Sequence, residues 1–84
     1  MSNNEISITM IPVDSSQLAA IGHDADNSTL AIQFKRGVGV GNTYYYQNFD
    51  ADNFKEFKEA PSVGSHFYQH IKPFADKFPY AKID

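Results

Sequence analysis

The chain contains no cysteine and no tryptophan, and it has no long run of apolar residues. Without cysteine it can form neither a disulfide nor a thiolate metal site, so its stability must come from packing. No stretch reaches the ~18 apolar residues that would span a bilayer, and the amino terminus lacks the basic and apolar segments of a secretory signal. We therefore expect a soluble, cytoplasmic protein that does not associate with membranes.

An excess of basic residues is also missing. Seven lysine and arginine residues stand against ten aspartate and glutamate residues, which gives a net charge of −3. Proteins that bind nucleic acid over a broad surface normally carry a clear basic excess, so the chain as a whole does not attract phosphate. The charge is unevenly placed, however, because lysines outnumber acidic residues over residues 53–82.

Aromatic side chains are what the chain has in quantity. It holds seven phenylalanines and five tyrosines in 84 residues. A domain of this length buries only a little over ~60% of its unfolded-chain surface, so large rings make its core efficient. We expect one domain over residues 6–84, preceded by a flexible amino-terminal segment at residues 1–5.

Alternating apolar residues predict three or four antiparallel strands in the first part of the chain. The expected strands cover residues 6–10, 17–23, 29–35 and 43–49. In the third of these, Leu30, Ile32 and Phe34 share one face, and the Asp and Asn residues before it are typical of a turn. The glycine-rich residues 36–42 predict a long, flexible connection to the last strand.

Two helices are expected after the strands. Asn53 and Glu56 have capping-box spacing, which predicts a helix over about residues 52–59 that ends before Pro61. Ser62 is a suitable N-cap for a second helix, which Pro73 ends or bends. The remaining tail should return over the core, in a register that the sequence does not fix.

Strands followed by helices predict an α+β fold, with a three- or four-stranded antiparallel meander followed by two helices packed on one face. The opposite face of the sheet would then be partly exposed.

The strongest functional signal is the run of Tyr44, Tyr45 and Tyr46. On a strand, Tyr44 and Tyr46 share one face and Tyr45 lies on the other. Rings that point toward the helices would be core, each burying ~150 Å² or more. Rings on the open face could stack nucleobases at ~1–3 kcal/mol each, helped by the nearby cations Lys35 and Arg36. The sequence leaves both arrangements open.

Patterns for catalysis and metal binding are incomplete. Asp24 and Asp50 each begin a string that resembles a calcium loop, but both strings lack required ligands. His66 and His70 have the i, i+4 spacing of metal ligands without the usual adjacent glutamate, so we expect His70 to be partly buried and hydrogen-bonded. No nucleophile elbow accompanies the serines. We predict no catalytic residue, no metal site and no cofactor.

The order of several short motifs resembles the KTSC domain, a small module found alone in bacterial and phage proteins and at the carboxy terminus of some lysyl-tRNA synthetases. The resemblance runs from about Ile8 to Ile71. It rests on residues 13–16, 18–24, 30–34 and 60–64, the pair Tyr44 and Tyr46, and Phe67 with Ile71. There are two departures, because His23 stands where the family has tyrosine and the hairpin at residues 37–42 is longer.

The resemblance implies a sheet followed by two helices, and it implies RNA binding through Tyr44 and Tyr46, aided by Lys35 and Arg36. We therefore expect a non-enzymatic binding module with RNA or a protein as its partner. The alternative is a protein-interaction or inhibitor domain, of phage or bacterial type, whose acidic amino-terminal part meets a basic partner. An unpaired strand edge also offers a route to a homodimer.

Overall fold

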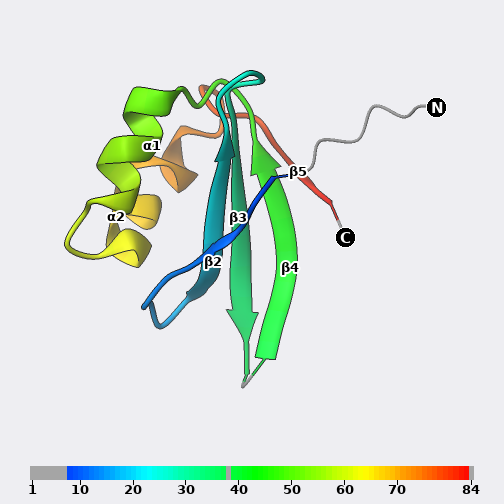
Figure 1. Cartoon of the computed structure of the whole chain (residues 1–84), viewed down its shortest axis with the longest axis vertical. Helices are drawn as coiled ribbons and strands as arrows, with labels where there is room; N and C mark the ends of the chain where they lie inside the picture. The colour runs from blue at the N-terminus through cyan, green and yellow to red at the C-terminus, as the bar shows by residue number, and fades with distance from the viewer. Residues whose placement is uncertain (1–7, 38, 84) are drawn as a thin grey trace.

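A computed structural model describes residues 8–37 and 39–83 of the chain. Over these residues the fold is α+β, with a five-stranded antiparallel sheet in the order β1-β2-β3-β4-β5 and two helices against one face (Figure 1). The strands are β1 (Ile11–Pro12), β2 (Leu18–Asp24), β3 (Thr29–Arg36), β4 (Gly39–Tyr46) and β5 (Tyr80–Lys82). The helices are α1 (Ala51–Lys58), α2 (Val63–His70) and the short 3-10 helix η1 (Lys72–Phe74).

The predicted meander is confirmed by β2, β3 and β4, which pair in chain order. After the helices the chain returns as β5, which pairs with β4 so that Tyr44 lies opposite Lys82 and Tyr46 opposite Tyr80. The sequence could not give this pairing, because three exposed residues carry no apolar alternation that would fix a register.

The first strand was expected at residues 6–10, and this prediction is wrong for residues 8–10. The strand contains only Ile11 and Pro12, which lie opposite Ile21 and Ala20 of β2. Proline has no N–H to donate, so it is tolerated in a short strand at the edge of a sheet. Residues 6 and 7, and the expected flexible segment 1–5, lie outside the described residues.

The connection between β3 and β4 is a tight hairpin and not the long loop that the glycines predict. Pairing continues until Arg36 lies opposite Gly39. Gly37 has φ of 60°, a left-handed conformation that glycine adopts without steric cost. The glycines therefore serve a close turn and the strand that follows it.

The core lies between the sheet and the two helices. Its sheet side comes from alternate residues of the meander, and its helix side comes from α1, α2 and the segments beside them. The largest fully buried side chains are Phe49, Phe57, Phe67, Leu18, Ile21, Leu30, Ile32 and Ile71. The predicted shared face of Leu30 and Ile32 is confirmed, since both belong to this core.

Short polar side chains start both helices. The backbone N–H of Asn53 donates to Oδ1 of Asp50 over 2.8 Å, so Asp50 is the N-cap of α1 in place of the expected Asn53. The backbone N–H of Ser65 donates to Oγ of Ser62 over 3.2 Å, which confirms Ser62 as the N-cap of α2. Each cap satisfies a backbone donor that the first helical turn leaves free.

Small residues line the reverse face of the sheet, away from the helices. Ala20 and Ala31 are buried there, and Gly22 lies opposite Ala31. A Cβ atom added at Gly22 would lie 2.6 Å from the carbonyl oxygen of Thr9 and 2.7 Å from Cγ2 of Ile8. The segment before β1, blue in Figure 1, therefore rests directly on this face and covers part of it.

We expect Gly22→Val to lower the free energy of unfolding by about 1–3 kcal/mol, because the new side chain overlaps the backbone of Thr9. Urea denaturation measures this change. Gly39→Val in β4 is the matched control, since the nearest atom to its added Cβ is 3.9 Å away, and its stability should change by no more than about 0.5 kcal/mol. An unchanged Gly22→Val protein would show that residues 8–10 do not rest on the sheet.

Candidate functional site

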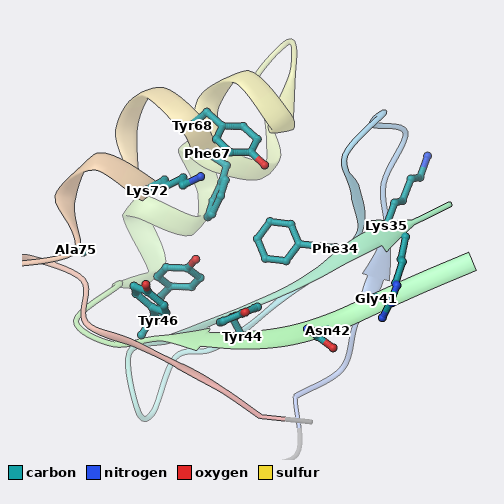
Figure 2. Close-up of a pocket in the computed structure, with 12 residues that line it drawn as sticks. Phe34, Lys35, Gly41, Asn42, Tyr44, Tyr46, Phe67, Tyr68, Lys72 and Ala75 are labelled. Carbon is teal, nitrogen blue, oxygen red and sulfur yellow. The ribbon is translucent and has the colours of Figure 1, made fainter.

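A groove lies between the sheet and α2, with a volume of about 560 Å³ (Figure 2). Pockets of this size are typical of sites that enclose small molecules or single groups of larger ones. Aromatic side chains form most of its wall: Phe34, Tyr44, Tyr46, Phe67, Tyr68 and Tyr80. Among the described residues that line it, Lys35, Arg36 and Lys72 are the charged ones, and none is acidic.

The floor of the groove is built by β3 and β4. Tyr44 and Tyr46 lie opposite Ile32 and Leu30, so all four side chains share the face that carries the helices. The ring of Tyr46 lies 5.6 Å from that of Phe67 in α2, in an edge-to-face arrangement. The predicted common face of the two tyrosines is confirmed.

The sequence allowed two arrangements, and one of them placed these tyrosines on the face of the sheet away from the helices. That arrangement is wrong. Tyr46 is 5% exposed and belongs to the core. Tyr44 is half-buried beside Phe34, with ring centroids 5.6 Å apart. Both rings face α2 because the helices pack on the side of the sheet that carries the larger residues.

Three consecutive residues at the end of β3 line the groove: Phe34, Lys35 and Arg36. The pairing of β3 with β4 is irregular beside them, because two steps along β3 from Gln33 to Lys35 match three steps along β4 from Thr43 to Val40. The extra residue of this bulge lies in β4, where it increases the local twist. The structure thus brings together the four predicted site residues: Tyr44, Tyr46, Lys35 and Arg36.

The roof of the groove comes from α2 and the turn after it. Phe67 is buried, whereas Tyr68 is 37% exposed. The Nζ atom of Lys72 lies 4.9 Å from the centre of the Tyr68 ring, close enough for a cation–π interaction. Lys72 and Lys35 lie at opposite ends of the groove in Figure 2, with Phe34 and Tyr44 between them.

Sequence reasoning missed Tyr68, Lys72 and Tyr80 as groove residues. Tyr68 and Lys72 are four residues apart, which places them on one side of a helix, so this spacing was an available signal. Tyr80 had no such signal, because its place depends on the pairing of β5 with β4.

The groove holds the hydroxyl of Tyr46 in its neutral form. Burial, with smaller contributions from the neighbouring Tyr80, Tyr44 and Tyr68, raises the pKa of Tyr46 to about 12. Near neutral pH the charge along the groove therefore comes from Lys35, Arg36 and Lys72.

The histidines of α2 differ from expectation. His70 is exposed, so its predicted partial burial is wrong, and His66 is the more buried of the two. The ring of His66 lies 5.5 Å from Phe57 and 4.7 Å from His70. Burial lowers the pKa of His66, and the nearby His70 lowers it further.

His23 has a structural role at the other end of the sheet. Its Nε2 atom donates to the carbonyl oxygen of Phe49 over 2.6 Å. Its ring also stacks on Phe54 of α1, with centroids 4.9 Å apart. His23 therefore ties β2 to the start of the helical layer.

Residues 8–37 and 39–83 contain neither a cluster of metal ligands nor a membrane-spanning helix. No three histidine or acidic side chains in these ranges are placed to hold a metal ion. No helix in these ranges is long and apolar enough to cross a membrane.

We expect the stability of the protein to fall as pH rises from about 10 to about 12, partly through Tyr46. In that range the unfolded chain has lost the Tyr46 proton and the folded chain still holds it, so alkali favours unfolding. Urea denaturation across this range should show a shallower decline for Tyr46→Phe, which cannot ionise. Parallel declines in the two proteins would contradict the raised pKa.

Comparisons with known proteins agree with this architecture. A family model described as the KTSC domain matches residues 14–76. An uncharacterized protein of Stutzerimonas stutzeri (strain A1501) is 30% identical over 74 residues, which cover 88% of this chain and 96% of that protein. A crystal structure of a KTSC domain protein from Yersinia pestis is 37% identical, with a TM-score of 0.77 over 93% of this chain and 100% of that one. The chain belongs to the KTSC domain family.

Proposed function

We propose that this KTSC domain is a non-enzymatic module that binds single-stranded RNA in the groove between the sheet and α2. The observation that carries the proposal is the composition of that groove, in which aromatic rings and cations meet and no acidic residue contributes from residues 8–37 and 39–83. Nucleobases stack on aromatic side chains, and phosphates are attracted to lysine and arginine. A groove with both features suits a strand whose bases are not paired.

The exposed rings supply the stacking surface. Tyr68 is 37% exposed and Tyr80 is 55% exposed, and both line the groove. Stacking of a base on such a ring is worth ~1–3 kcal/mol and tolerates any sequence, because every base has a π-face. Tyr46 and Phe67 are buried, so they shape the groove and offer little ring surface to a base.

The local charge supports the proposal in spite of the acidic chain. The net charge of −3 argues against a broad nucleic-acid surface. Lys35, Arg36 and Lys72, however, line one groove, and none of the described residues that line it is acidic. The described lining also has no histidine, serine or cysteine, so its lysines and tyrosines have no partner there for a nucleophile–base pair, which favours binding over nucleophilic catalysis.

We expect Tyr68→Ala to weaken the binding of a fluorescent, unstructured RNA by about 1–2 kcal/mol, because one stacking surface is lost. Fluorescence anisotropy at low salt measures the affinity. Phe74→Ala is the matched control, since Phe74 is 48% exposed and lies outside the groove. This control should bind as the unmodified protein does.

The same titration separates RNA binding from the protein-interaction alternative. RNA held by phosphate contacts must bind more weakly as salt rises. Absence of any anisotropy change, together with salt-resistant retention of a protein from nuclease-treated lysate, would overturn the RNA proposal. Equal losses in Tyr68→Ala and Phe74→Ala would place the RNA elsewhere on the surface.

A further inference from the structure

We infer that the groove recognises one nucleotide together with the two phosphates that flank it, and not a longer stretch of strand. This inference rests on the proposed binding of single-stranded RNA. It adds the size of the recognised unit and the part of the groove that meets each phosphate.

The cations are divided between the two ends of the groove. Lys35 and Arg36 end β3 beside the hairpin, whereas Lys72 follows α2. Figure 2 shows Lys35 and Lys72 on opposite sides of the aromatic rings. A strand that crosses the groove would meet positive charge, then rings, then positive charge, which is the order of a phosphate, a base and a second phosphate.

The middle of the groove has room and free ring surface for about one base. Most rings already contact each other: Phe34 meets Tyr44 at 5.6 Å and Phe67 at 5.5 Å. The two most exposed rings of the lining come from different walls, Tyr68 from α2 and Tyr80 from β5. A volume of about 560 Å³ between these walls accommodates a nucleoside, and one base can use both exposed rings.

The charge of the remaining surface limits the footprint. Outside the three cations of the groove, the chain holds ten acidic and four basic side chains. Phosphates beyond the two ends of the groove therefore experience a net repulsion from the rest of the chain. Longer strands should consequently gain little affinity over the minimal unit.

The number of bound phosphates also sets the salt dependence of the binding constant. When a protein neutralises Z phosphates of a single strand, the logarithm of the binding constant falls with the logarithm of salt concentration with a slope of about −0.7Z. Two phosphates give a slope of about −1.4. A strand bound along a wider basic surface would give a much steeper slope.

The experiment compares small ligands of known phosphate content by calorimetry or by displacement of the fluorescent RNA. We expect adenosine 3′,5′-bisphosphate to bind within about threefold of an adenosine hexanucleotide. Adenosine 5′-monophosphate and 3′-monophosphate should each bind about five- to tenfold more weakly, because each lacks one charge-assisted contact.

Variants at the two ends assign the phosphates. In Lys72→Gln, one of the two monophosphates should bind as tightly as the bisphosphate, whereas the other should still bind more weakly. Lys35→Gln combined with Arg36→Gln should show the opposite pattern. Lys55→Gln is the control, because Lys55 is exposed on α1 and outside the groove, and it should behave as the unmodified protein.

The outcomes separate this inference from the proposed function. A hexanucleotide that binds more than about tenfold tighter than the bisphosphate would overturn the one-nucleotide unit and leave RNA binding intact. Equal effects of the Lys72 variant and the Lys35 and Arg36 variant on both monophosphates would overturn the two-ended arrangement. Failure of every ligand, the hexanucleotide included, would overturn RNA binding itself.

Discussion

The contact of Phe67 with the sheet decides the geometry of this domain. Its buried ring meets Phe34 of β3 edge to face at 5.5 Å and Tyr46 of β4 at 5.6 Å. Such pairs add about 0.5–1.5 kcal/mol each to the burial of the rings, and they favour fixed angles. One side chain of α2 thus holds the helix at a set height above two neighbouring strands. The groove exists because this contact keeps the exposed part of α2, including Tyr68, off the floor.

Much of the fold follows from local patterns in the sequence. Alternation in residues 29–35 fixes which side chains share a face of β3, and Ser62 marks the start of α2 through one hydrogen bond. These features depend on neighbours in the chain, so the sequence alone predicts them. The pairing of β5 and the position of the segment before β1 depend on contacts between distant residues, and no local pattern encodes them.

The groove likewise combines features that local sequence predicts with features that it does not. Alternation correctly places Tyr44 and Tyr46 on one face, but it cannot say which face the helices will cover. Alternation would place Phe34 and Lys35 on opposite faces of β3, yet both line one groove beside the irregular pairing of β3 with β4. A bulge is set by the match between two strands, so inspection of one strand does not reveal it. Tyr44, Tyr46, Lys35 and Arg36 line one groove, and their part in binding stays a prediction. The open face of the sheet, one of the two settings that the sequence allowed, is wrong for the two tyrosines.

The return of the chain as β5 has a consequence for the order in which the domain matures. Tyr80 reaches the groove only after both helices have been made, because β5 follows them in the chain. Most of the buried core comes from residues 18–71, and Phe78 joins it from the segment before β5. The groove is therefore completed only when β5 pairs with β4, so its shape depends on a segment that is synthesised after both helices.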